Sequence, residues 1–529
     1  MKASDELWDV IVVGTGMGGA TLGHALAQAG RRVLFVEKGI VDRTGVGGIR
    51  GMYPESSPGF GKLDTAQRYE RLLEAGRSID VIESTRTFVP FIGTGGGGST
   101  ALFGMAMERF FPEDFTPREN HRNADSTLPE AWPVTYAEMA PWYATAETLY
   151  RVSGAPDPLR AGNGPPLRAP AEFSAPNEAL AEVLHRQGLH PYALHLACDD
   201  VPACATCQGV LCPRGCKRDA ATTCLLPALR EHGAQILDRT CVVGVEADRT
   251  RVTGVLVERA GARQLLRGRH IVLAAGALMT PAILLNSTGG AWPRGVGNDT
   301  DQVGRNLMRH AIELVFLRGA PRLREGERSK QISLSDFYLP GDRSEGLKLG
   351  TVQSLGALPS GADVLGRMPP LLRAIARPFV GAIWQHHIRP LNVLAAIMED
   401  LPHAHNRVTP GAPFSDGARQ RVRMSYRLST QDLDRAATFH RVVTRALAPL
   451  RPRAVALARR NAAVAHACGT CRFGIDPATS VLDAHNRAHG LDNLYVVDAS
   501  FFPSSSGTNP SLTIAANALR VAAHLRDRL

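Results

Sequence analysis

The chain has 529 residues, a formal net charge of +10 at pH 7 and nine cysteines. This length suits two or three domains rather than one large core. The basic residues are scattered and form no Lys/Arg-rich run, which argues against nucleic-acid binding and leaves a solvated surface as the explanation.

The N-terminal residues lead directly into an apolar strand, without a charged and then apolar leader. No other stretch is long and apolar enough to span a bilayer. We therefore expect a cytoplasmic protein with no membrane span and with reduced cysteines, although export with a partner subunit stays open.

The first predicted unit, residues 9–39, has the order strand, glycine turn, helix, strand. Residues 10–13 form an apolar run of the buried-strand type, residues 20–29 are helical, and residues 32–36 form a second strand that ends at Glu37. This order is typical of a dinucleotide-binding fold. An ordinary βαβ glycine turn is the alternative interpretation.

The turn of this unit reads Gly14-x-Gly16-x-x-Gly19. Gly14 permits the tight turn, Gly16 lets the backbone approach a pyrophosphate, and Gly19 lets the helix pack closely on the strand. The helix N-terminus can face the phosphates, and Glu37 can bind the ribose hydroxyls. The acid alone does not separate FAD from NAD.

Residues 93–100 contain four consecutive glycines, flanked by apolar rather than polar residues. Such a run removes side chains where a flat ring system passes close to the backbone, which favours FAD over NAD. A flexible surface linker is the alternative.

The segment 198–224 contains six of the nine cysteines. Four of them, Cys204, Cys207, Cys212 and Cys216, have a C-x2-C-x4-C-x3-C spacing that could hold an iron–sulfur cluster. Zinc would normally show two C-x2-C pairs, and only Cys204 and Cys207 form one. A disulfide between neighbours and a lid-like loop of reduced, packed cysteines are the other interpretations.

The C-terminal segment begins with a lone histidine, His466, before a Gly-Thr turn. An alternating apolar strand then ends in Asp498, and a Ser/Gly-rich loop leads to Asn509 and Pro510 at the start of a helix. Strand ends and first helical turns are places where proteins hold a phosphate-bearing cofactor. His466 and Asn509 come from separate loops that could converge on one face of that cofactor.

These motifs together resemble the glucose–methanol–choline (GMC) oxidoreductases, flavoenzymes that oxidise alcohols. The resemblance implies an α/β protein with a Rossmann-like FAD-binding domain and a second, α+β substrate domain built on an antiparallel sheet. It makes His466, in the family's H-x-x-G-T-C-R sequence, the catalytic base, and Asn509 the residue that orients the alcohol oxygen. The histidine would accept the hydroxyl proton while the substrate carbon delivers a hydride to flavin N5.

The resemblance also implies which residues line the FAD. They are Gly14, Gly16, Gly18, Gly19, Glu37, Lys38, Gly95, Gly98, Ser99, Val243, Ala275, Asp498, Ala499, Asn509 and Pro510. Phe103 precedes Gly104 and Met105 where the family has Asn-Gly-Met beside the flavin ring. His310 fits the family's G-x-N-L-x-x-H turn, where the histidine is expected to be structural rather than catalytic.

Five segments follow from the resemblance. The FAD-binding domain would comprise residues 1–155 and 226–310, a cysteine-rich lid residues 156–225, the substrate-binding domain residues 311–460, and the catalytic, FAD-binding C-terminal segment residues 461–529. The cysteine-rich segment resembles that of family sugar dehydrogenases with a cluster, and also a metal-free loop of cholesterol-oxidase-type members.

We therefore expect FAD-dependent oxidation of a small-molecule alcohol, such as a sugar, a sterol or a secondary metabolite. Oxygen or an unidentified carrier would accept the electrons. Two alternatives stay open. One is an electron-transferring dehydrogenase subunit with an iron–sulfur cluster in the cysteine segment, and the other is a non-oxidative flavoprotein of the same fold, such as a lyase or decarboxylase.

Overall fold

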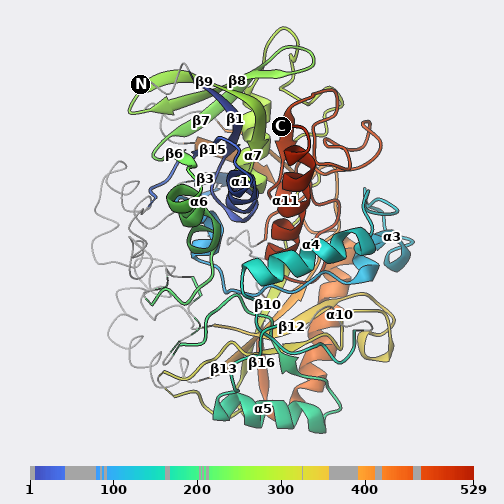
Figure 1. Ribbon diagram of the computed structural model, residues 1–529. Coiled ribbons are helices and arrows are strands. Elements are labelled where there is room, and N and C mark those ends of the chain that lie inside the picture. Colours follow the sequence, from blue (N-terminus) through green and yellow to red (C-terminus); the bar gives the residue numbers. More distant parts are fainter. Residues whose placement is uncertain are drawn as a thin grey trace, which may run out of the picture.

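Two bodies make up the protein, one built on a mixed sheet and one on an antiparallel sheet (Figure 1). The computed structural model describes residues 6–41, 79–83, 86–88, 92–160, 167–201, 204, 206, 208–209, 212, 214–324, 326–356, 391–411, 420–456 and 466–529. Among these residues, no helix is both long enough and apolar enough to cross a bilayer.

The upper body in Figure 1 contains a seven-stranded sheet. Its parallel strands lie in the order β6 (Gln235–Leu237), β2 (Val33–Val36), β1 (Leu7–Val13), β9 (Ala262–Leu273) and β17 (Leu494–Val496). The antiparallel strands β8 (Val252–Arg259) and β7 (Cys241–Ala247) extend it from the other part of β9. The strand order reverses between β1 and β9, and such switch points are where open α/β sheets bind ligands, outside the carboxyl ends of the strands.

Helices cover this sheet on both faces, which explains why β1 and β2 read as continuous apolar runs rather than alternating ones. They are α1 (Met17–Gln28), α4 (Tyr136–Leu149), α6 (Leu226–Glu231), α7 (Gly276–Asn286) and α11 (Ser511–Arg526). α1, α4 and α11 pack against one another, and the Tyr143 hydroxyl of α4 bonds the Thr513 hydroxyl of α11 at 2.8 Å. The N-terminal and C-terminal segments thus form one apolar core.

The lower body contains a six-stranded antiparallel sheet (Figure 1). Its order is β16 (Pro452–Ala456), β10 (Ala311–Leu317), β13 (Asn392–Met398), β12 (Gly350–Ser354), β11 (Ile332–Leu334) and β5 (Tyr192–Ala193). α5 (Ala175–Arg186) and α10 (Thr430–Ala446) cover one face and share an apolar core with it. The sheet was expected from the sequence, but its edge strand β5 was not, because a strand of two residues is too short to show an alternating apolar pattern.

A third, four-stranded sheet combines distant parts of the chain. It consists of β14 (Arg407–Pro410), β15 (Gln420–Ser425), β3 (Ile79–Glu83) and β4 (Arg86–Phe88). α7 packs on β14 and β15 through Leu278, Met279 and Val408. The short elements are η3 (Gly98–Ala101), η4 (Pro112–Phe115), α3 (Pro117–Asn120), the π-helix η5 (Ala221–Leu225), η6 (Asp342–Ser344), η8 (Ala448–Leu450) and η10 (Ala499–Phe501).

A buried ion network ties the two bodies together. The Lys348 ammonium, before β12, lies 2.6 Å from the Asp114 carboxylate in η4 and 2.8 Å from the Glu399 carboxylate after β13. Glu399 also contacts His121 at 2.7 Å and Arg435 of α10 at 3.4 Å. Buried charges need such close partners, because an unpaired one would keep its full desolvation cost. The network therefore fixes the antiparallel sheet against the loop that follows residue 111.

Candidate functional site

His466 and His310 lie side by side although they are far apart in the sequence. The backbone of Met308 and Cys468 forms a two-way bridge, with N–H···O distances of 3.0 and 2.9 Å, which brings the two segments together. His466 has φ of +57°, in the left-handed region that non-glycine residues rarely adopt. Such a conformation costs free energy and is kept where the surrounding contacts over-determine it.

A chain of hydrogen bonds fixes the protonation of both rings. His310 Nε2 lies 3.3 Å from the Ser505 carbonyl oxygen, which can only accept, so Nε2 carries the proton. The neutral His310 ring then has an accepting Nδ1, which lies 2.9 Å from Nδ1 of His466. His466 must therefore donate through Nδ1, which leaves its Nε2 as an unprotonated lone pair.

Burial keeps these rings neutral. It lowers the pKa of His310 to about 4. It also lowers the pKa of His466 well below its ordinary value, and the neighbouring His310 and the Lys330 ammonium lower it further. A histidine in this state can accept a proton at Nε2 over the whole neutral range.

The loop of residues 503–509 carries Asn509, and protein hydrogen bonds hold it at successive residues. Asp114 accepts from the Ser506 hydroxyl at 2.9 Å and from the Tyr338 hydroxyl at 2.7 Å. The Gly507 carbonyl accepts from a β12 hydroxyl at 2.8 Å. Because Ser505 in the same loop accepts from His310, the loop that carries Asn509 is also bonded to the His310–His466 pair.

The Asn509 side chain is oriented by β12. Gln353 Nε2 donates to Asn509 Oδ1 at 2.7 Å, so the amide NH₂ of Asn509 is left to donate elsewhere. Asn509 is nearly buried, directly before Pro510, which caps α11. The arrangement can present a fixed donor to an oxygen atom.

The glycine turn after β1 forms a cradle with room for a cofactor. Gly14 has φ of +95°, and a Cβ there would lie 2.5 Å from the Ala274 carbonyl oxygen. A Cβ on Gly18 would overlap the Val497 carbonyl, and one on Gly19 the Gly14 carbonyl. At Gly16, by contrast, no described atom lies within 4 Å of an added Cβ. The open space beside Gly16 lies at the switch point of the sheet, where a pyrophosphate would fit.

The two acids expected to face the cofactor are engaged by the protein. Glu37 is 5% exposed, and its carboxylate accepts from Thr15 N and Oγ1 (3.0 and 2.7 Å), Gly39 N (2.8 Å) and Gly95 N (3.1 Å). Asp498 accepts from Gly276 N at 2.9 Å, Thr280 Oγ1 at 2.5 Å and Ser500. The Glu37 carboxylate thus connects the glycine turn to the glycine run through hydrogen bonds, and the Asp498 carboxylate connects the end of β17 to α7.

The other predicted cofactor residues come from several segments of the chain. A Cβ on Gly98 would lie 3.0 Å from Gly16 Cα, so the glycine run closes over the turn, and Ser99 Oγ accepts from Gly93 N at 3.2 Å. Val243 lies at a bulge of β7, between the paired residues Val242 and Gly244, which takes it out of the ladder register. Lys38 follows Glu37 and is partly buried. Ala275 caps α7, and Ala499 begins η10 after Asp498.

The cysteine segment gathers thiols into a buried cluster. Sγ of Cys204 lies 3.7 Å from that of Cys198 and 3.6 Å from that of Cys216, and Cys212 lies 3.4 Å from Cys216. Hydrogen bonds from Cys198 and Cys216 lower the pKa of the Cys204 thiol, whereas those of Cys198 and Cys216 are raised. Cys207, one of the four predicted ligands, lies outside the described residues, and none of the eight described cysteines forms a disulfide.

The thiol cluster is compatible with a metal. The sulfur atoms of Cys198, Cys204 and Cys216 all lie within 4.8 Å of one another. Tetrahedral ligation at about 2.3 Å per sulfur sets neighbouring sulfurs roughly 3.8 Å apart. The cluster packs against Met105 and Phe103, the segment expected beside the flavin ring. Cys198 was not among the predicted ligands.

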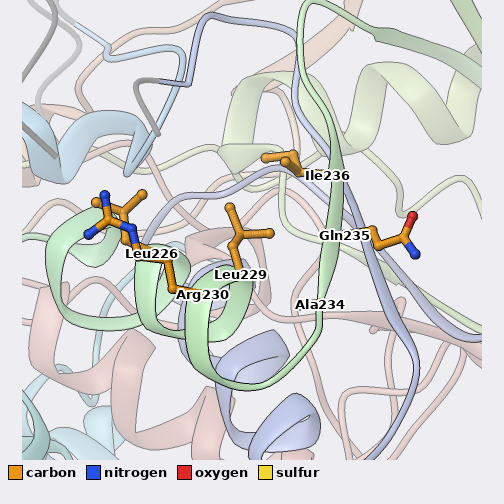
Figure 2. Close-up of a pocket in the computed structure, with 6 residues that line it drawn as sticks. All are labelled: Leu226, Leu229, Arg230, Ala234, Gln235 and Ile236. Carbon is orange, nitrogen blue, oxygen red and sulfur yellow. The ribbon is translucent and has the colours of Figure 1, made fainter. Parts of the chain in front are cut away.

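A cavity elsewhere in the protein does not coincide with this site. It has a volume of about 290 Å³ and lies between α6 and β6, where Leu226, Leu229, Arg230 and residues 234–236 line it (Figure 2). Neither histidine nor Asn509 is among its lining residues. β6 pairs with β2, so the cavity lies on the Glu37 side of the crevice.

Two residues near His466 and Asn509 were not predicted from the sequence, and a third was predicted with a different role. His310 was expected to be structural, yet it contacts His466 directly. Gln353 and Lys330 lie in the part of the chain with the weakest motifs, and no local signal marks them. Only the G-x-N-L-x-x-H turn could have singled out His310.

Comparisons with known proteins identify what the chain is similar to. Residues 9–312 and 402–518 match the N- and C-terminal family models described as GMC oxidoreductase. The chain is 30% identical to paromamine 6'-oxidase from Streptomyces fradiae, over 98% of this chain and 92% of that protein. It is also 30% identical to 6'''-hydroxyparomomycin C oxidase from Streptomyces lividus, over 99% and 92%.

A solved structure supports the fold. The crystal structure of pyridoxine 4-oxidase from Mesorbium loti matches with a TM-score of 0.65 and 21% identity, over 98% of this chain and 99% of that one. At this identity the likeness concerns the fold alone. The predicted family and the predicted fold class are both confirmed.

Proposed function

The chain belongs to the GMC oxidoreductase family and acts on CH–OH groups, and from this premise we propose that it is an FAD-dependent alcohol oxidase with His466 as its base. The observation that carries the proposal is the hydrogen-bond chain from Ser505 through His310 to His466. It leaves one free basic nitrogen in a buried site, where proton abstraction is the chemistry to expect.

The family implies FAD, and the crevice fits it. Gly16, where an added Cβ meets no described atom within 4 Å, would lie beside the phosphates, Gly98 beside the ring system, and Val243, at its bulge, beside the adenine. Bound FAD would supply the acceptor for the hydride that leaves the substrate carbon. Glu37 and Asp498 would act mainly by holding the crevice in shape, because their oxygens already accept protein hydrogen bonds.

His466 Nε2 takes the hydroxyl proton of the alcohol. The proton produces an imidazolium whose Nδ1–H still donates to His310, so the ring does not need to turn. The nearby Lys330 ammonium disfavours this charged form, which makes the proton transient and returns the base to its neutral state.

Asn509 orients the alcohol oxygen. Its NH₂ donates to that oxygen while Gln353 holds its Oδ1, so the oxygen meets a donor whose direction is fixed before binding. An asparagine cannot accept the proton, which leaves His466 as the base and Asn509 as the positioning group.

The substrate is a small polyhydroxylated alcohol and the electron acceptor is oxygen. Support comes from the two relatives at 30% identity, both named as oxidases. A non-oxidative reaction is disfavoured because both of these relatives carry oxidase names.

The test is the visible spectrum of the protein purified without oxygen, before and after glycerol or another polyol is added. A flavin spectrum that bleaches with the alcohol, then returns with hydrogen peroxide when oxygen is admitted, supports the proposal. A protein without flavin bands, or a flavin that no alcohol bleaches, would refute it.

A second candidate function follows from the thiol cluster. A dehydrogenase subunit could pass electrons through an iron–sulfur group held by Cys204, Cys212 and Cys216, with Cys198 or Cys207 beside them. Iron and acid-labile sulfide in the purified protein, with a broad reducible band under the flavin spectrum, would favour it. Cys216→Ser should remove that band, whereas Cys241→Ser, a buried cysteine of β7 outside the cluster, should not.

A further inference from the structure

Lys330 is a buried lysine that forms no ion pair with any carboxylate in the described part of the chain. It is 3% exposed, and within the described chain its ammonium donates only to Gln208 Oε1, at 3.4 Å. Lys348, 1% exposed, has two carboxylates within 3 Å. Burying an ammonium without a counter-charge costs several kcal/mol, of which one long bond to a neutral amide recovers little. Among the described residues, therefore, no counter-charge is in contact with the Lys330 ammonium.

The ammonium lies beside Gly104, in the segment expected next to the flavin ring. A Cβ on Gly104 would be 2.5 Å from Lys330 Nζ, so only a glycine there leaves room for it. Lys330 also acts electrostatically on His466. It directly precedes Gln331 and β11, and β11 pairs with β12, whose Gln353 holds Asn509.

The surrounding charges do not neutralise Lys330. Glu108 is the carboxylate that acts on it electrostatically, but that side chain forms its hydrogen bond with the Tyr192 hydroxyl, at 2.6 Å, and no ion pair with Lys330. A second buried ammonium, Lys217, repels it. Burial lowers the pKa of Lys330 to about 8, which leaves it charged at neutral pH. The site wall beside His466 is therefore positive.

We propose that Lys330 is the counter-ion for a carboxylate carried by the substrate. The inference rests on the proposed function and deepens it: the alcohol is a hydroxy acid of the sugar-acid type. The same ammonium disfavours amino alcohols, because two like charges would be buried together.

The test uses three compounds with the same carbon skeleton and a primary hydroxyl. They are glycerate, glycerol and 3-amino-1,2-propanediol. At the end opposite the primary hydroxyl they carry an anionic carboxylate, a neutral hydroxyl and a cationic amine, respectively. Dissociation constants are measured without oxygen from the change that each compound causes in the flavin spectrum, and the rate of flavin bleaching is measured separately. We expect glycerate to bind about 30-fold or more tightly than glycerol, and the amine most weakly.

The variants isolate the charge. Lys330→Met should abolish the preference for glycerate over glycerol, and Lys330→Arg should keep most of it. Gly104→Ala, which displaces the ammonium without removing it, should weaken the preference even if Lys330→Met does not fold. Arg263→Met, an exposed arginine at the β8–β9 hairpin, serves as the matched loss of charge and should change nothing.

Three outcomes would overturn the inference while leaving the proposed function intact. The first is equal binding of glycerate and glycerol by the wild-type protein. The second is a Lys330→Met variant that keeps the preference for glycerate. The third is a Lys330→Met variant that loses only kcat with glycerol, because the charge would then stabilise the alkoxide rather than bind a carboxylate. If none of the three compounds nor any other alcohol bleaches the flavin, the proposed function itself has failed.

Discussion

His310 Nδ1 and His466 Nδ1 lie 2.9 Å apart, and of two neutral rings only one can donate across this contact. The Ser505 carbonyl determines which ring donates, because it accepts a hydrogen bond from the Nε2–H of His310. The relationship makes His310 a positioning residue for the base. It also explains why both residues occupy a buried place that would otherwise favour apolar side chains.

Substituting His310 tests this relationship. His310→Leu removes the acceptor, so the proton of His466 can move to Nε2 and block it; we expect a loss in kcat of about 10- to 100-fold, as for other groups that orient a reacting ring. His310→Asn can still accept through Oδ1 and should recover part of the rate. Anaerobic flavin-bleaching rates give the measurement. Equal losses in the two variants would indicate that His310 only fills space.

Gln353 should act through Asn509. Gln353→Glu has no donor for Asn509 Oδ1, so the amide turns and presents oxygen instead of NH₂ to the substrate. We expect about a 100-fold loss, close to that of Asn509→Ala, since either change removes one donor to a developing oxyanion. The double variant should lose no more than either single one. Additive losses would contradict the assigned orientation.

The reaction rate should be insensitive to pH across the neutral range. Burial lowers the pKa of His466 well below 6.5, so its unprotonated form, which is the active one, dominates at pH 7. The rate should fall only on the acid side, by tenfold per pH unit below the lowered pKa. Flavin-bleaching rates from about pH 5 to 8 check this. An acid limb centred above 6.5 would exclude His466 as the base in this environment.

Stability should fall with acidity through His310. The pKa of the folded ring lies near 4 and the ordinary value is 6.5, so the unfolded chain binds more protons between the two. The contribution of the neutral His310 ring to the free energy of unfolding is present above pH 6.5 and is lost as the pH falls toward 4. The full loss is about 3 kcal/mol. Urea unfolding of the wild type and His310→Asn at both ends of this range provides the comparison. The variant should lose less, since it lacks the His310 ring and the pKa of His466 is lowered less without it.

The sequence predicted the fold where the evidence is local. The strand, turn and helix at residues 9–39 became β1, α1 and β2, and the last strand and helix became β17 and α11. Apolar runs, glycine turns and a proline before a helix act over a few residues, so they can be read without tertiary contacts. The expected antiparallel sheet is also present, although its strands were not individually predicted.

The site was predictable only in part. His466 and Asn509 stand in motifs, but their partners His310, Gln353 and Lys330 come from strand pairing and from bridges across more than 100 residues. Glu37 and Asp498 were placed at strand ends, yet only the structure reveals that protein N–H and hydroxyl groups already occupy their oxygens. The assigned catalytic and cofactor residues stay predictions.

The most direct test of the account compares the wild type with His466→Ala at equal flavin content. The measurement is the rate at which an alcohol bleaches the flavin without oxygen. The account predicts a rate lower by about 10²- to 10⁴-fold in the variant, because the free Nε2 is lost while the crevice stays intact. A variant that binds flavin and is bleached at the wild-type rate would contradict the role of His466 as the base.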